Sequence, residues 1–479
     1  MQPTFNGREQ ATAGPPYALL DGVLTKAECA ALVARAEAAG FSPMALAYPP
    51  GYRNNDRLVW DDEGFSARLF RRIAARLPQT LGGARVVALN PRFRVCRYTA
   101  GQSFTRHQDG AFEPTPERRS LLTCQLSLSE PHEFGGGHTR FFSGRTGALY
   151  ASVRPRRGDA ILFRHDTWHD GEPVSHGTKI VLRTDVVYDG VPGRTTTDAR
   201  TLGHHAGYVF AATPLASGHV ATASRDRTVR LFDARERRQV AVVGGHEASV
   251  TCLAEALPGV LISGSRDGTT RVLDARCEAP SESHRHLAFG SAVLALCRLG
   301  GGAFAVGAAD GTVRRCHASN GDATLLAAHE GWVWALARLR GLVASGAEDG
   351  SLSLVSDHGD VRWRWAGPSP IRALAALDDD RLAVGFANGD VALFLVTQGG
   401  PELAVRTRVV GSGSVDALAP AEGGLVCGGE DGVVRRLDGR LRERSSVNLG
   451  SFVRAVAPLG GDRFVTGSYD GYARVVSLA

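Results

Sequence analysis

The sequence has very little lysine and no long apolar run. Lysine occurs only at Lys26 and Lys179, while arginine fills the other basic positions. No apolar stretch approaches the roughly 18 residues that a membrane-spanning helix needs, so we expect no transmembrane segment. The segment 1–16 is polar and lacks a basic start followed by an apolar stretch, which argues against a signal peptide.

Closely spaced cysteines and clustered charge are also absent. None of the eight cysteines forms a Cys-x-x-Cys pair, so neither structural zinc nor a disulfide framework is indicated, and we expect a cytoplasmic protein. The net charge of +6 comes from arginines that are spread along 479 residues rather than gathered in one stripe. This distribution argues against a nucleic-acid-binding protein, and nothing indicates a membrane partner.

The chain is too long for one ordinary hydrophobic core, and the pattern of the sequence changes near residue 192. No internal repeat is visible before this point. After it, similar segments recur about every 40 residues, a period that is typical of solenoids and propellers. We therefore predict one domain over residues 1–192, with a motif-bearing core at about 86–190, and a second domain over residues 193–479.

The repeated unit contains two alternating apolar strands joined by Asp-Gly or a close variant. Such dipeptides favour tight hairpins because both residues tolerate positive φ. The turns stand at Asp226, Asp267-Gly268, Asp310-Gly311, Asp349-Gly350, Asn388-Gly389, Asp431-Gly432 and Asp470-Gly471. Several units also carry a histidine before the first strand, as at His204, His246 and His329.

These units resemble the WD-repeat family of β-propellers, although the Trp-Asp pair survives only as Phe232-Asp233 and Leu273-Asp274. The resemblance implies an all-β domain, and the number of turns predicts seven blades. The last unit is one strand short of a four-stranded blade, and we expect a segment around 195–202 to supply the missing outer strand and close the ring. A propeller of this kind is expected to bind a protein partner. Four tryptophans are candidates for such a surface or for blade packing: Trp332, Trp334, Trp363 and Trp365.

The first domain is predicted to contain two helices and a set of short antiparallel strands. Thr25 is placed to cap a helix that continues to Ala39, with apolar residues at helical spacing. A second amphipathic helix is expected over 64–77. From Val86 to Tyr188, short strands alternate with turns that contain glycine and proline, which indicates an α+β domain with a barrel or sandwich of strands.

A His-x-Asp pair at His107 and Asp109 is the first candidate for chemistry. Two residues that stand two apart on a strand project from the same face, so they offer one imidazole and one carboxylate to a divalent metal. A third ligand would complete the facial triad that holds non-haem Fe(II) and leaves coordination positions open. The pair alone is weak evidence, because the same spacing recurs at His358 and Asp360 in the repeat region.

A second segment, 158–188, strengthens the interpretation of His107 and Asp109 as metal ligands. It contains an apolar strand, a histidine, a turn with glycine and proline, and a strand with Lys179 and Arg183. Together with the motif RYTAGQSFTRHQD (97–109) and the segment FGGGHTRFF (134–142), it resembles the prolyl 4-hydroxylase-like branch of the Fe(II)/2-oxoglutarate oxygenases. The resemblance implies an α+β double-stranded β-helix (jelly-roll) oxygenase domain, followed here by the all-β seven-bladed WD-repeat-like propeller.

The resemblance assigns roles by position. It implies that His107, Asp109 and His169 hold the iron and that Lys179 pairs with the far carboxylate of 2-oxoglutarate. Arg183 is the competing partner for that carboxylate, and His165 and His176 are the competing distal ligands. Tyr98 and Thr123 match positions that contact the co-substrate. One of only two lysines stands where a buried carboxylate needs a cation, which supports the assignment independently.

The implied reaction consumes 2-oxoglutarate and O2, yields succinate and CO2, and hydroxylates a substrate, with ascorbate as the implied reductant. We expect a protein substrate, with a prolyl residue as one candidate, and a propeller that recruits the substrate or a partner. Two alternatives are open: a hydroxylase of a small molecule or free amino acid, and an inert scaffold whose propeller mediates interactions. The loop 46–56 carries no signal that identifies the substrate.

Overall fold

The computed structural model describes residues 15–44, 53–110, 112, 118–143, 147–190, 199–276, 281–319, 322–397, 399–410 and 413–478. The chain divides into two compact units, Met1–Gly193 and Arg194–Ala479. Within the described ranges, no helix has the length and apolar character needed to cross a membrane. The seven described cysteines are free thiols.

Two helices in the first unit begin at side-chain caps. Helix α1 (Lys26–Ala39) follows Thr25, whose hydroxyl accepts from the Glu28 amide while the Glu28 carboxylate accepts from the Thr25 amide. This confirms the predicted cap. Helix α2 (Glu63–Ile73) begins after Asp62 and ends four residues before the predicted Leu77, with a 3-10 turn at Ala74–Arg76. Leu77 precedes Pro78 and is extended, so the helical turns do not continue beyond Arg76.

The strands of the first unit form antiparallel sheets. The nine-stranded sheet has the order β1 (Tyr17–Leu20), β12 (Ala160–Arg164), β8 (Arg118–Ser127), β15 (Lys179–Asp189), β6 (Arg92–Tyr98), β3 (Asp56–Asp61) and β2 (Ser42–Pro43), with β5 (Ala84–Leu89) beside β15 and β4 (Thr80–Leu81) beside β5. The four-stranded sheet has the order β11 (Leu149–Val153), β10 (Thr139–Phe142), β13 (Trp168–Gly171) and β7 (Phe104–His107). A short pair joins β14 (Val174–Gly177) to β9 (Phe134–Gly136).

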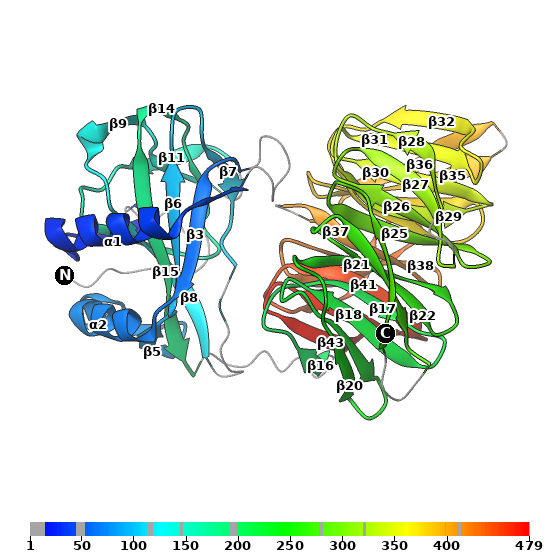
Figure 1. Cartoon of the computed structure of the whole chain (residues 1–479), viewed down its shortest axis with the longest axis horizontal. Coiled ribbons are helices and arrows are strands. Elements are labelled where there is room, and N and C mark those ends of the chain that lie inside the picture. Colours follow the sequence, from blue (N-terminus) through cyan, green and yellow to red (C-terminus); the bar gives the residue numbers. More distant parts are fainter. Residues whose placement is uncertain are drawn as a thin grey trace. The chain divides into compact units, whose positions relative to one another are not determined.

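Strand β15 separates the core from the opposite face of the large sheet. Ile180, Leu182 and Tyr188 are buried in the main apolar cluster, which also contains residues of α1 and α2. Both helices lie against this side of the sheet (Figure 1). Because side chains alternate along a strand, Lys179 and Arg183 face the other way, into a cavity. The same strand therefore supplies apolar residues to the core and cations to the cavity.

The second unit consists, over its described residues, of seven four-stranded antiparallel sheets, which confirms the predicted propeller (Figure 1). Six sheets follow the chain in order: β17 (Val209–Pro214) to β20 (Arg238–Val243), β21 (Val250–Leu257) to β24 (Ser281–Ala288), β25 (Val293–Gly300) to β28 (Ala323–Ala328), β29 (Val333–Leu339) to β32 (Val361–Ala366), β33 (Ile371–Ala376) to β36 (Gly400–Arg408), and β37 (Val415–Ala421) to β40 (Glu443–Asn448).

In each of these six sheets, two middle strands lie between the first and the last strand named above. These are β18 (His219–Ser224), β19 (Val229–Asp233), β22 (Val260–Ser265), β23 (Thr269–Asp274), β26 (Ala303–Ala308), β27 (Thr312–His317), β30 (Leu342–Ala347), β31 (Ser351–Ser356), β34 (Arg381–Phe386), β35 (Asp390–Thr397), β38 (Gly424–Gly429) and β39 (Val433–Asp438).

The seventh sheet joins the beginning of the unit to its end. Strand β16 (Ala199–His204) pairs with β43 (Tyr472–Ser477), which continues through β42 (Arg463–Ser468) to β41 (Val453–Gly460). The predicted closing strand therefore exists, although it starts at Ala199, and 195–198 lie outside the described residues. Leu202 of β16 is buried beside Phe232 and Val465, so the closure rests on apolar packing as well as on backbone hydrogen bonds.

Histidine–aspartate pairs link two of the predicted turns to the residues that precede the blade. His246 Nδ1 lies 2.9 Å from Asp267 Oδ2, and His205 Nδ1 lies 3.0 Å from Asp226 Oδ2. In the first blade the histidine that contacts the aspartate is His205 rather than the adjacent His204. The sequence offers two adjacent histidines there, and only the fold decides which one turns inward.

The tryptophans of the second unit contribute mainly to packing. Trp363 and Trp365 lie against the apolar cluster shared by the fourth and fifth blades. Trp332 is buried, and the indole of Trp334 donates to Glu348 and stacks with Arg372. The packing interpretation of these residues therefore accounts for their positions.

We predict that Leu202→Ala lowers the free energy of unfolding of the propeller by about 2–5 kcal/mol, because it leaves a cavity in the closing sheet. Thr201→Ala, on the exposed side of the same strand, should change it by less than about 0.5 kcal/mol. Urea unfolding of the full chain, followed by tryptophan fluorescence, measures both. Equal effects in the two variants would show that β16 does not stabilise the ring.

Candidate metal centre

The register of two strands brings two histidines together. His107, the last residue of β7, is the direct cross-strand partner of His169 on β13. Their ring centroids are 4.3 Å apart. Because directly opposed residues on antiparallel strands are close neighbours, the two imidazoles project from the same face of the four-stranded sheet.

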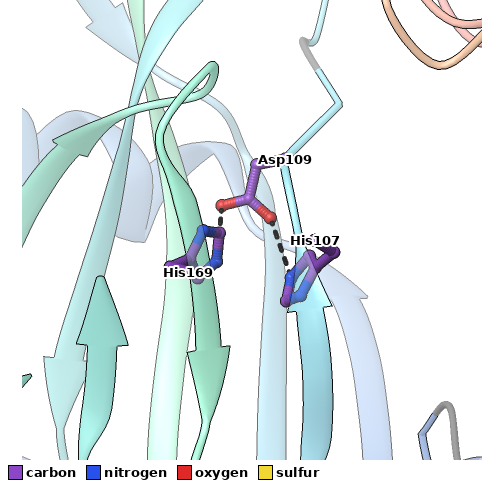
Figure 2. A group of neighbouring side chains, drawn as sticks. All are labelled: His107, Asp109 and His169. Atoms are coloured by element: carbon purple, nitrogen blue, oxygen red, sulfur yellow. Dashed lines mark ion pairs between the residues drawn. The ribbon is translucent and has the colours of Figure 1, made fainter. Parts of the chain in front are cut away.

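Asp109 completes the cluster from a loop. We expected His107 and Asp109 to share one face of a strand, but β7 ends at His107 and Asp109 lies two residues beyond it. The Asp109 amide donates to the carbonyl oxygen of His165 at 3.0 Å, which turns the chain and directs the carboxylate back toward the histidines. The three side chains point toward one another (Figure 2).

Backbone carbonyl groups determine which imidazole nitrogens face the cluster. Nδ1 of His107 is 2.7 Å from the Thr105 carbonyl, and Nδ1 of His169 is 2.9 Å from the Thr167 carbonyl. A carbonyl only accepts, so each Nδ1 carries a proton, and in the neutral imidazole the nitrogen with the lone pair is Nε2, which faces the cluster. The two Nε2 atoms lie 3.6 Å from Asp109 Oδ1 and Oδ2, respectively, which is too long for a hydrogen bond.

The donor set fits a divalent transition metal. One ligand atom from each residue lies within 4.8 Å of the others, and all three residues are buried. Two neutral imidazoles and one carboxylate on one side of an ion form the facial triad that is typical of non-haem Fe(II). The fixed Nδ1 contacts orient both rings before any ion arrives.

The electrostatics of the cluster favour the metal-binding protonation states. Burial, and then the neighbouring His107, lower the pKa of His169 to about 3, so its imidazole is neutral at physiological pH. Burial alone would raise the pKa of Asp109, but Arg183 and the two histidines hold it well below its usual range. His169 therefore presents a lone pair, and Asp109 presents a negative charge.

Aromatic rings enclose the histidines. Phe104 stacks on His107 with centroids 3.6 Å apart, and Phe163 lies 4.6 Å from His169. Phe163 belongs to an apolar cluster with Phe141 and Ile161. These rings limit the access of water from the sides of the two imidazoles.

A cavity opens in front of the three residues. Its lining consists of Arg53, Cys96, Tyr98, Phe104, His107, Asp109, Gln125, Thr139, His169, Asp170, Gly171, Lys179, Val181 and Arg183. Lys179 is 7% exposed, and its Nζ lies 5.4 Å from the centre of the Tyr98 ring. No carboxylate of the described residues forms an ion pair with it, and burial lowers its pKa to about 8. A buried cation of this kind needs an anionic ligand.

Two other predicted residues, Thr123 and Arg183, contact Asp109. Thr123 does not line the cavity; its hydroxyl donates to Asp109 Oδ2 at 2.5 Å and lies 3.1 Å from His165 Nδ1. Arg183 Nη1 lies 2.7 Å from Asp109 Oδ1, and its Nη2 donates to Asp185 at 3.3 Å. Both side chains therefore contact the aspartate directly.

The alternative histidines lie outside the cluster. His165 is buried, and its Nε2 is 2.8 Å from Ser120 Oγ. His176 is exposed on β14. Neither shares the group of possible metal ligands found among the described residues.

Several residues of the cavity were missed in the sequence. Gln125 donates to Thr139 at 3.0 Å, and both line the cavity. Strand alternation from Thr123 and Tyr98 could have indicated Gln125 and Cys96, which stand two residues away. Arg53 had no such signal, because it reaches the cavity through an isolated bridge to Phe104.

Comparisons with known proteins find a match to a different family within each unit. Residues 93–184 match the profile of the 2OG-Fe(II) oxygenase superfamily, and residues 197–233 and 237–274 match the WD domain, G-beta repeat. The chain thus contains a 2OG-Fe(II) oxygenase domain and WD repeats.

The curated relatives that match are bacterial PKHD-type hydroxylases. One from Janthinobacterium sp. (strain Marseille) is 36% identical over 88 residues, which are 18% of this chain and 38% of that protein. One from Sphingopyxis alaskensis is 31% identical over 90 residues, 18% of this chain and 40% of that protein. The chain therefore spans about two fifths of the length of these relatives.

Solved structures match the second unit. A structure titled U3-55K aligns with a TM-score of 0.53 and 17% identity, over 59% of this chain and 99% of that one. The WD40 β-propeller domain of Doa1 aligns with a TM-score of 0.52 and 20% identity, over 58% of this chain and 97% of that one. At these identities the likeness concerns the fold alone.

We predict that a divalent ion raises the melting temperature of the first unit through His107, Asp109 and His169. At a free-ion concentration 100 times the dissociation constant, the ion should stabilise the folded state by about 2.7 kcal/mol. Asp109→Ala and His169→Ala should abolish the shift because each removes a ligand, whereas His176→Ala should retain it. Calorimetry of the full chain with and without Mn²⁺ measures this, and a shift that persists in both ligand variants would contradict the assignment.

Proposed function

We propose that the chain is an Fe(II)- and 2-oxoglutarate-dependent dioxygenase that hydroxylates a protein side chain and converts 2-oxoglutarate to succinate and CO2. The observation that carries the proposal is the presence, in one cavity, of a two-histidine, one-carboxylate cluster and a buried lysine without an anionic partner among the described residues. The cluster fits the metal, and the lysine fits the far carboxylate of a dicarboxylic acid.

His107, Asp109 and His169 would hold the iron. Iron bound there supplies the redox chemistry that couples decarboxylation of the 2-oxo acid to hydroxylation by O2. The protein fixes both imidazoles through their Nδ1–H groups and directs both Nε2 lone pairs at the Asp109 side of the cavity. Phe104 and Phe163 shield these rings from water.

Lys179 would bind and orient the co-substrate. An ammonium group that is already buried attracts a carboxylate strongly, because its surroundings screen the two charges weakly and its own desolvation took place on folding. Tyr98 lies under the lysine, and Thr139 and Gln125 offer hydroxyl and amide groups in the same lining. Arg183 is the weaker candidate for this role because its terminal nitrogens already contact two aspartates.

The proposal of a protein substrate rests on the attached propeller, a domain type that presents binding surfaces for other proteins. A prolyl residue is one candidate for the hydroxylated group, following the resemblance to prolyl 4-hydroxylase-like enzymes. We also propose a cytoplasmic location and ascorbate as the reductant that maintains Fe(II).

The test combines co-substrate turnover with mass spectrometry. The full chain with Fe(II), O2 and labelled 2-oxoglutarate should form labelled succinate, and His107→Ala should not. Proteins captured by the propeller should then gain the mass of one oxygen atom when the active chain is added. Succinate formation with a modified small molecule and no modified protein would support the small-molecule alternative, whereas no succinate would indicate an inert scaffold.

We predict that the affinity for 2-oxoglutarate falls as the pH rises above about 8, because Lys179 then loses the proton that gives it charge. The lowered pKa places this loss within the working range of the assay. In Lys179→Arg the affinity should stay nearly constant between about pH 7 and 9, since arginine remains charged. Titration calorimetry on the Ni²⁺-loaded chain measures both, and identical pH profiles would exclude Lys179 as the anchor.

A further inference from the structure

Arg183 occupies a position that the co-substrate does not explain. It lies on the cavity face of β15, four residues after Lys179, yet its two terminal nitrogens contact carboxylates of the protein. Nη1 lies 2.7 Å from Asp109 Oδ1, and Nη2 lies 3.3 Å from Asp185 Oδ1. The guanidinium therefore bridges a candidate metal ligand to a second, fully buried aspartate.

Asp185 fixes the side of the Arg183 guanidinium that does not contact Asp109. Its other oxygen, Oδ2, accepts from Asn90 Nδ2 at 2.8 Å and from Arg94 Nη1 at 3.2 Å. Asp185 is 0% exposed, so this side of the bridge cannot swing into solvent. The contact with Asp185 therefore fixes the position of the guanidinium that contacts Asp109.

The second oxygen of Asp109 is held by a neutral chain. The Thr123 hydroxyl donates to Asp109 Oδ2, His165 Nδ1 lies 3.1 Å from Thr123 Oγ1, and His165 Nε2 lies 2.8 Å from Ser120 Oγ. The carboxylate is thus fixed on one side by an ionic bridge and on the other by hydrogen bonds. Two fixed contacts leave it little freedom to rotate.

We propose that Arg183 is a positioning residue for the metal ion, which sets the orientation of Asp109 and so the metal affinity. A planar guanidinium holds two carboxylates in a fixed mutual geometry, whereas the three donors of an ammonium group can rotate and its stem is flexible. By fixing Asp109 in advance, Arg183 removes the reorganisation that binding would otherwise require. This role rests on the metal site of the proposed function. It gives the two cations of β15 different roles: Lys179 binds the co-substrate, and Arg183 orients the metal ligand Asp109.

The test is a crossed pair of matched substitutions in the full chain, Arg183→Gln and Lys179→Gln. Metal affinity is measured by Co²⁺ titration, and 2-oxoglutarate affinity is measured separately at saturating Co²⁺. Arg183→Gln should weaken Co²⁺ binding by about 10- to 100-fold, as is typical when a group that orients a ligand is lost, and should leave 2-oxoglutarate affinity unchanged. Lys179→Gln should do the reverse.

The visible absorption of bound Co²⁺ gives a readout that a purely structural role would not change. It should alter in Arg183→Gln and remain as in the unmodified chain in Lys179→Gln. Arg183→Lys, which keeps the charge and loses the fork, should also bind Co²⁺ more weakly, and it decides the matter if the glutamine variant does not fold.

The outcomes are distinct. Co²⁺ affinity within about twofold of the unmodified chain in the folded Arg183 variants would overturn the positioning role. A loss of 2-oxoglutarate affinity alone in those variants would also overturn it and would make Arg183 the anchor. Failure of the unmodified chain to bind Co²⁺ would instead refute the metal site itself.

Discussion

The pairing of β7 with β13 is the contact on which the candidate site depends. It places His107 directly opposite His169, and a shift of the register by one residue would turn one imidazole to the other face of the sheet. The aromatic rings beside the histidines and the carbonyl groups that accept from their Nδ1 atoms act only on rings already brought together by this register. Asp109 then needs only a short loop to reach them.

Strand β15 couples this site to the fold. Its apolar side chains enter the core beneath the two helices, and its polar side chains, Lys179, Arg183 and Asp185, line or support the cavity. Since one strand does both, a change that disturbs the core shifts the cations of the cavity as well. Strand β15 thus adds two cationic side chains to the cavity, which suits an anionic co-substrate beside an anionic metal ligand.

Much of the fold could be predicted from the sequence, because the patterns that determine it are local. The cap at Thr25, the propeller and its seven blades follow from helix capping and from repeated Asp-Gly turns. The contacts of Thr123 and Arg183 with Asp109 could not, because they depend on the mutual placement of β8, β15 and the loop after β7. Likewise, His205 rather than His204 contacts Asp226, since adjacent residues are distinguished only by the direction in which the fold turns them.

The most direct test of the account is a crystal structure of the chain with Mn²⁺ and a 2-oxoglutarate analogue that cannot be decarboxylated. The account predicts an anomalous peak for Mn²⁺ within bonding distance of His107, Asp109 and His169, and the far carboxylate of the analogue on Lys179. Arg183 should still contact Asp109 in that structure. A metal peak elsewhere, or a carboxylate on Arg183 with Lys179 free, would contradict it.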